Sequence, residues 1–179
     1  MKNQPKIIVI TGAESTGKST LTGQLAQHFG VPFIPEIARD YVEKLNRKYT
    51  FNDVEQIAKL QIETLEKMKS ETDSLIFVDT WLIITKVWFE FVYDNVPGWL
   101  IDAIQKTKID LFLVCDTDLP WIDDPVRENG GENRNILQNL YLKNISDFGY
   151  DFRIVKGSNE KRLLNAINFV NEAIKNQNG

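Results

Sequence analysis

The sequence is poor in cysteine and histidine, with one of each among 179 residues: Cys115 and His28. A single cysteine excludes an intrachain disulfide and fits a reducing cytoplasm. Cys115 ends an apolar run, and the histidine lies far from it in the sequence, so the pattern disfavours a catalytic thiol. We therefore expect Cys115 to be a small buried residue.

Long hydrophobic runs and a surplus of basic residues are also missing. No apolar run is long enough to span a membrane, and no signal peptide is visible, so we expect a cytoplasmic protein without a membrane partner. The net charge is −4 and the isoelectric point about 5.1, whereas extended nucleic-acid binding favours a basic surface. The length fits one domain, residues 1–179, and we expect no nucleic-acid partner.

One motif stands out near the start of the chain. It matches the phosphate-binding pattern G-x-x-x-x-G-K-[ST] and lies between a predicted strand at Lys6–Ile10 and a helical pattern that begins near Lys18. The loop N–H groups and the helix N-terminus attract phosphate, Lys18 can reach the β- and γ-phosphates, and the Ser19 hydroxyl can bind Mg²⁺. The motif therefore predicts binding of ATP and Mg²⁺. The residues expected to contact the nucleotide are Gly12, Ala13, Glu14, Ser15, Thr16, Gly17, Lys18, Ser19 and Thr20.

Short apolar runs recur along the chain, and helical patterns separate most of them. This alternation predicts an α/β fold, with a five-stranded parallel sheet covered on both faces by helices. Ligands bind beyond the carboxyl ends of such strands, so the residues after each run are candidates for the site. The predicted strands are Lys6–Ile10, Pro32–Ile34, Leu75–Val78, Leu111–Cys115 and Phe152–Val155.

Three helical patterns carry further expectations. The pattern over residues 52–68, starting at Asn52 with Glu55 three residues later, places Gln61 on its apolar face. Gln61 is either a buried glutamine satisfied by backbone or part of a polar ligand pocket, and we include it among the candidate substrate contacts. The pattern over residues 81–93 is apolar nearly all round and predicts a buried helix. The pattern over residues 159–175 has a single apolar stripe and predicts packing alone.

Two carboxylates follow predicted strands. Asp79 comes directly after one, where a Mg²⁺-associated carboxylate is expected, although aspartate also suits a helix N-cap. Glu36 follows another, where it can accept the proton of an acceptor hydroxyl or orient that hydroxyl, although a glutamate also suits a helix start. Arg39, one turn later, could hold a phosphate or pair with Glu36. We predict that these three residues contact the substrate.

A polar, glycine-containing segment at about residues 119–134 predicts a short lid. Arg127 and Arg134 are seven residues apart and could stabilise charge on the transferring phosphoryl group, and Trp121 is a candidate substrate contact. The alternative is a solvated loop with ordinary charges. Gly157, in a loop after the fifth predicted strand, could let the backbone contact the adenine edge of ATP.

Taken with the phosphate motif, three stretches resemble the ribosylnicotinamide kinase domain of the NadR type. The resemblance implies a three-layer P-loop NTPase fold and ATP-dependent phosphorylation of the 5′-hydroxyl of nicotinamide riboside, which gives nicotinamide mononucleotide. It places Glu36 and Asp79 near the acceptor hydroxyl and Mg²⁺, and it implies aromatic contacts to the nicotinamide ring, with Trp81, Trp88 and Trp121 as candidates. The stretches are Glu36 with Arg39 and Tyr41, residues 77–80, and residues 121–124 followed by Arg127.

Two alternatives remain open at this point. The acceptor could be another nucleoside or a nucleotide, or the protein could be a regulatory ATPase with no small-molecule acceptor. NadR-type proteins carry an adenylyltransferase domain ahead of the kinase domain. Because the phosphate motif begins at residue 12, we expect the kinase domain alone. The oligomeric state cannot be inferred.

Overall fold

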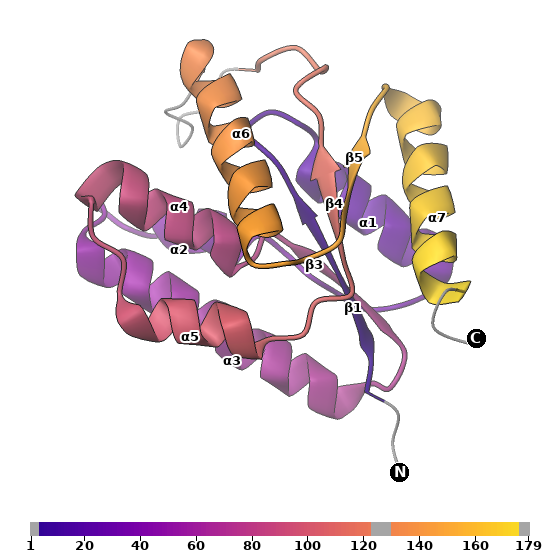
Figure 1. Ribbon diagram of the computed structural model, residues 1–179, viewed down its shortest axis with the longest axis horizontal. Coiled ribbons are helices and arrows are strands. Elements are labelled where there is room, and N and C mark those ends of the chain that lie inside the picture. The colour runs from indigo at the N-terminus through magenta and orange to yellow at the C-terminus, as the bar shows by residue number, and fades with distance from the viewer. Residues whose placement is uncertain (1–3, 123–129, 176–179) are drawn as a thin grey trace.

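Five parallel strands form one sheet with helices on both faces (Figure 1). The computed structural model describes residues 4–122 and 130–175. The strand order is β2-β3-β1-β4-β5, so the predicted α/β fold with a five-stranded parallel sheet is confirmed. The strands are β1 (Lys6–Thr11), β2 (Phe33–Ile34), β3 (Leu75–Asp79), β4 (Leu111–Cys115) and β5 (Phe152–Val155).

The helices form two layers whose membership follows from the alternation of side chains along each strand. Ile8 and Ile10 of β1 pack in the core beneath α1 and α7, whereas Ile7 and Val9 pack in the core beneath α3, α4, α5 and α6. Buried parallel strands of this kind need an apolar cover on both faces. The helices are α1 (Lys18–Phe29), α2 (Ile37–Glu43), α3 (Phe51–Glu71), α4 (Leu82–Tyr93), α5 (Gly98–Lys106), α6 (Glu132–Asp147) and α7 (Asn159–Lys175).

The start of α3 differs from its prediction. The helix begins at Phe51, and the N-cap is Thr50, whose side chain and that of Asp53 form a reciprocal capping box. The sequence offers two overlapping capping patterns, and the structure uses the one in which Thr50 supplies the hydroxyl. Arg47 adds an ion pair to Asp53 at 2.6 Å, which ties the preceding loop to the helix.

The segment predicted as a lid, 119–134, ends in a helix. Residues 132–134 form the first turn of α6, a helix that we did not predict because its apolar and polar residues do not separate into a clear stripe. Arg127 and residues 123–126 lie outside the described residues.

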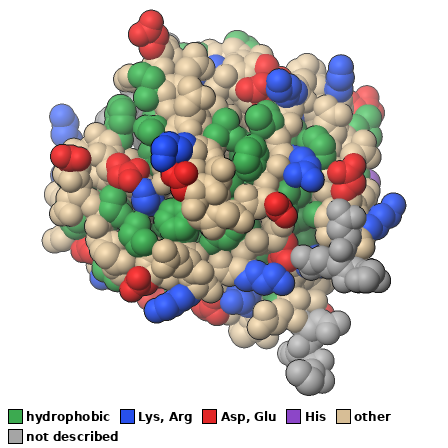
Figure 2. Space-filling view, viewed as in Figure 1, with side chains coloured by type: hydrophobic (Ala, Val, Ile, Leu, Met, Phe, Trp, Pro, Cys, Tyr) green, Lys and Arg blue, Asp and Glu red, His purple; other side chains and the backbone are tan. Residues whose placement is uncertain are grey.

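Surface features bear on the predicted partners. Figure 2 shows acidic and basic side chains interspersed over the described residues of one face, without a gathering of basic ones. None of the helices in the described ranges is both long and apolar enough to cross a bilayer.

Candidate active site

The phosphate loop connects β1 to α1 and depends on a glycine where it passes β4. Gly12 has φ of 135°, and a Cβ atom there would lie 2.6 Å from the carbonyl oxygen of Cys115. A glycine is therefore required at this position on two counts, conformation and space. Gly17, with φ of 74°, is the N-cap of α1, so the helix N-terminus follows directly from the loop.

Lys18 is held across the loop. Its ammonium group donates a hydrogen bond of 2.9 Å to the carbonyl oxygen of Ala13, and the side chain is largely buried. Thr16 donates from its hydroxyl to the same carbonyl at 2.8 Å. The bond from Lys18 keeps a positive charge inside the loop, where phosphate would bind.

The two predicted metal-binding residues lie together. The Ser19 side chain lies close enough to the Asp79 carboxylate, at the last residue of β3, to lower the pKa of that carboxyl. Hydroxyl and carboxylate oxygens are the ligands that Mg²⁺ prefers, and nucleotide-bound Mg²⁺ usually takes only one or two of them from the protein. These two residues therefore fit the metal that the phosphate loop implies.

Asp79 is strongly buried, and burial is the main reason why its pKa is raised. The negative charge of Glu36 raises this pKa further, whereas the hydrogen bond from Ser19 and the charge of Lys18 lower it. The next residue, Thr80, has φ of 71°, which is unusual for a β-branched residue. Its N–H donates a hydrogen bond of 2.9 Å to the carbonyl oxygen of Ile10. Strain of this kind is often found at functional sites.

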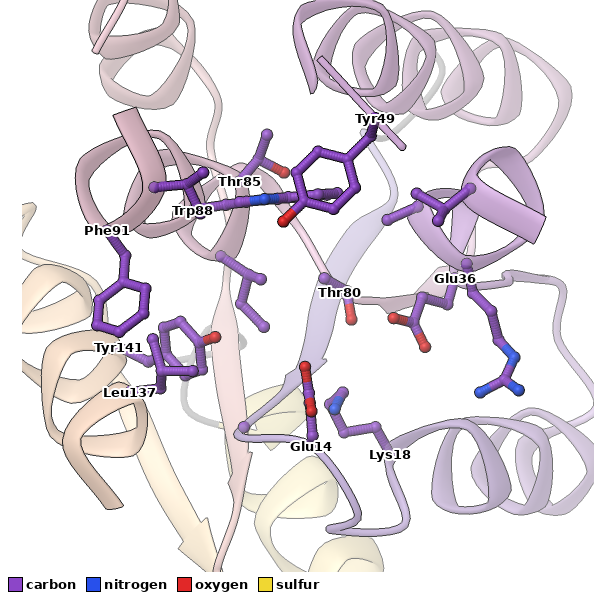
Figure 3. Close-up of a pocket in the computed structure, with 16 residues that line it drawn as sticks. Glu14, Lys18, Glu36, Tyr49, Thr80, Thr85, Trp88, Phe91, Leu137 and Tyr141 are labelled. Atoms are coloured by element: carbon purple, nitrogen blue, oxygen red, sulfur yellow. The ribbon is translucent and has the colours of Figure 1, made fainter. Parts of the chain in front are cut away.

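A cavity of about 240 Å³ opens next to the phosphate loop. Figure 3 shows Glu14 and Lys18 at one end, the Glu36 carboxylate pointing in from the side, and aromatic rings at the opposite end. The cavity thus brings the predicted residues Gly12, Glu14, Lys18, Glu36 and Arg39 together. Its walls come from the phosphate loop, α2, the loop before α3, the turn after β3, α4 and α6.

Tyr49 and Trp88 form the aromatic end, with ring centroids 4.8 Å apart at an interplanar angle of 80°. Tyr141 and Phe91 also line the cavity. Of the tryptophans suggested by sequence, Trp88 thus reaches the cavity, whereas Trp81 is 1% exposed within the apolar core. Trp121 does not line the cavity, and its ring packs against Gly130.

Two carboxylates of the cavity, those of Glu14 and Glu36, act on one of its aromatic side chains. The pKa of Tyr141 is raised chiefly by burial and then by the charges of Glu14 and Glu36. Both carboxylates therefore act at the position of the Tyr141 ring. Aromatic rings and carboxylates are groups that bind flat cationic ligands, and the same cavity also holds the positive charges of Lys18 and Arg39.

Two other predicted substrate contacts have partners within the protein. Gln61 is buried behind the cavity wall and accepts a hydrogen bond of 2.9 Å from Thr85, which does line the cavity. Of the two alternatives for Gln61, a glutamine satisfied by backbone or part of a polar ligand pocket, the structure shows a buried glutamine bonded to a side chain of the cavity lining. Arg39 forms an ion pair with Glu43 at 2.8 Å, one turn further along α2.

Arg134 and Gly157 lie next to the phosphate loop rather than in the cavity. The guanidinium of Arg134 donates to the carbonyl oxygens of Glu14, Ser15 and Leu119 at 2.8–3.0 Å. Gly157 donates its N–H to Asp118 at 2.6 Å. Thr20 is exposed on α1, one residue beyond Ser19.

The sequence interpretation missed several cavity residues: Tyr49, Thr80, Thr85, Phe91 and Tyr141. One available signal was the spacing within residues 132–147, where polar and aromatic side chains recur every three or four positions. Arg134, Gln138 and Tyr141 all fall on the buried face of α6. A helix that buries polar groups in this way has partners for them, and here the partners are in the phosphate loop and the cavity.

Comparison with known proteins places this geometry in context. A family model described as an AAA domain matches residues 7–162. The Trifunctional NAD biosynthesis/regulator protein NadR of Escherichia coli (strain K12) is 24% identical over 96% of this chain, which spans 43% of that relative's length.

Solved structures agree with the fold. A NadR protein in complex with NR has a TM-score of 0.76 at 22% identity, and a NadR protein with NAD and AMP-PNP has 0.73 at 24%; each match covers 94% of this chain and 49% of the other. Deoxyadenosine kinase from M. mycoides with products bound has a TM-score of 0.66 at 16% identity, covering 93% of this chain and 99% of the kinase. Structural likeness at these identities establishes the fold only.

Proposed function

The chain belongs to the AAA domain family, and from this premise we propose that it is an ATP-dependent kinase that phosphorylates the 5′-hydroxyl of nicotinamide riboside. The observation that carries the proposal is the single cavity with the phosphate loop at one end and the Tyr49–Trp88 pair at the other. A nucleoside can place its hydroxyl toward the donor phosphate and its ring among the aromatic side chains. The NadR relatives, one of them solved with NR, support this choice of acceptor.

In the proposed reaction the oxygen of the 5′-hydroxyl forms a bond to the γ-phosphorus of ATP, the bond from that phosphorus to the β–γ bridging oxygen breaks, and ADP leaves. The Glu36 carboxylate accepts or orients the hydroxyl proton, with Asp79 as the alternative. Lys18 and the loop N–H groups stabilise charge on the transferring group. Mg²⁺ bound by Ser19 and Asp79 would neutralise phosphate charge.

The charge of the acceptor ring is the specific point to test. Nicotinamide riboside carries a positive pyridinium ring, whereas the common nucleosides are neutral. We expect product from nicotinamide riboside at least tenfold faster, by kcat/KM, than from adenosine, cytidine or dihydronicotinamide riboside, which has nearly the same shape without the charge. Phosphorylated product is measured by chromatography, with acceptor-independent ATP hydrolysis as the blank.

The other outcomes separate the alternatives. Equal rates for a neutral nucleoside would favour a general nucleoside kinase. Hydrolysis that no acceptor changes would favour a regulatory ATPase. Glu14→Gln provides the matched variant, because it keeps the side-chain shape and removes one negative charge from the cavity; we expect it to narrow the preference for the charged ring.

The raised pKa of Asp79 predicts that the rate of the reaction falls at acidic pH, and that the pH of this fall depends on the Mg²⁺ concentration. As the pH falls through this pKa, the carboxylate becomes protonated at a higher pH than an ordinary aspartate and loses affinity for Mg²⁺. The proton and the cation compete, so raising Mg²⁺ should move the acid limb of the rate to lower pH. The measurement is kcat/KM for ATP against pH at limiting and saturating Mg²⁺. A limb that stays in place would assign it to a different group.

A further inference from the structure

The phosphate loop is held from outside by two buried arginines on different helices. Arg134 of α6 is 8% exposed and Arg162 of α7 is 5% exposed. Arg134 donates to the carbonyl oxygens of Glu14 at 3.0 Å and Ser15 at 2.9 Å. Arg162 donates to the carbonyl oxygen of Thr16 at 2.8 Å. Three consecutive carbonyl oxygens of the loop therefore accept hydrogen bonds from guanidinium groups.

Because peptide units are planar, these hydrogen bonds also determine the direction in which the loop N–H groups point. In a planar trans peptide, the carbonyl of one residue and the N–H of the next point in opposite directions. Holding the carbonyls of residues 14, 15 and 16 outward therefore turns the N–H groups of Ser15, Thr16 and Gly17 the other way. Those are N–H groups that a phosphate-binding loop directs at its anion.

Arg162 also ties this loop to the two neighbouring strand ends. Its guanidinium donates to Asp118 at 2.7 Å, to the Gly157 carbonyl at 2.7 Å and to the Asp116 carbonyl at 3.1 Å. The Asp118 carboxylate accepts in turn from the Gly157 N–H at 2.6 Å. One planar guanidinium thus fixes the ends of three loops relative to one another, which a flexible ammonium could not do.

Resting on the proposed function, we infer that Arg134 and Arg162 are positioning residues that preorganise the phosphate loop for the triphosphate by holding its outward carbonyls. This corrects two expectations from the sequence. Residues 159–175 were expected to pack and do no more, yet they contribute Arg162. Arg134 was expected to act on the transferring phosphoryl group; its contacts with the loop carbonyls support an indirect role instead.

The test separates loop geometry from charge and from general stability. Arg162→Lys keeps the positive charge but removes the planar guanidinium. Asp118→Asn weakens the contact between Asp118 and Arg162 without changing a residue of the phosphate loop. The matched control is Arg153→Met, which replaces an exposed arginine on β5 that donates a hydrogen bond to the adjacent Phe152 carbonyl. Binding of ATP and of inorganic tripolyphosphate is measured by calorimetry, KM for each substrate by steady-state kinetics, and folding by thermal denaturation.

We expect Arg162→Lys to weaken ATP and tripolyphosphate binding at least tenfold, and Asp118→Asn to weaken both about threefold. In both variants the KM for the acceptor should stay within twofold of the wild-type value. In the control variant, both affinities and both KM values should stay within twofold of wild type. If Arg162→Lys fails to fold, the result for Asp118→Asn decides. Unchanged ATP affinity, or equal losses for ATP and acceptor, would overturn the inference.

The same measurements distinguish the two proposals. A wild-type chain that binds ATP but phosphorylates no nicotinamide riboside contradicts the proposed acceptor and leaves the arginine effect measurable. A wild-type chain that binds neither ATP nor tripolyphosphate contradicts both.

Discussion

Replacing Lys18 by alanine is expected to lower phosphoryl transfer at least about a thousandfold, which corresponds to about 4 kcal/mol of transition-state stabilisation. The reason is position as well as charge. The Lys18 ammonium is held inside the loop by its bond to Ala13, so it costs little reorganisation to place it against the β- and γ-phosphates. The measurement is kcat and KM for ATP, with nucleotide binding followed separately by calorimetry.

Lys143→Ala is the matched control for this substitution. Lys143 is exposed on α6, forms an ion pair with Asp147 four residues later, and does not line the cavity. Exposed pairs of this kind contribute little to stability, so we expect wild-type kinetics. Turnover within tenfold of wild type in Lys18→Ala would rule out a central role for this lysine.

Replacing Glu36 by alanine is expected to reduce kcat about 10²- to 10⁴-fold, the range for loss of a general base, while ATP affinity stays within twofold. Glu36 lines the cavity and is the N-cap residue of α2. Its side chain makes no capping hydrogen bond, so its removal should leave the helix intact. Rates are measured with saturating ATP and acceptor.

Glu36→Gln distinguishes proton transfer from orientation. The amide keeps an acceptor oxygen but cannot take the proton, so kcat near that of alanine indicates a base, and kcat near wild type indicates that orientation suffices. Glu66→Ala, on the exposed face of α3, serves as control because Glu66 forms a surface ion pair with Lys69. Normal turnover in Glu36→Ala would exclude Glu36 and leave Asp79 as the alternative.

Much of the fold could be predicted because its signals are local. Each strand is a short apolar run, and each predicted strand matches an observed one to within a residue at either end. The phosphate motif combines a glycine turn, a lysine and a hydroxyl within eight residues, so it can be recognised from neighbours in the chain alone. Asp79 was named as a candidate site residue because it follows a predicted strand, and parallel strands end at the same edge of the sheet as the phosphate loop.

The cavity wall and the support of the loop could not be predicted in the same way. Tyr49 meets Trp88 because a loop between two helices packs against a third, and the capping of α3 by Thr50 was needed to place that loop. α6 was missed because its polar residues are buried by partners elsewhere in the fold. Gln138, for example, accepts from the N–H of Ala13, 125 residues away.

The sequence by itself determined that this protein has a phosphate loop, a parallel sheet and two carboxylates at strand ends, because those features depend on short-range pattern and on the common direction of parallel strands. Only the tertiary structure decided which side chains face the acceptor cavity and which hold the loop. Arg134 and Arg162 are ordinary charged residues in the sequence. Their function depends on loop carbonyls more than a hundred residues earlier, and only folding brings these groups within hydrogen-bonding distance.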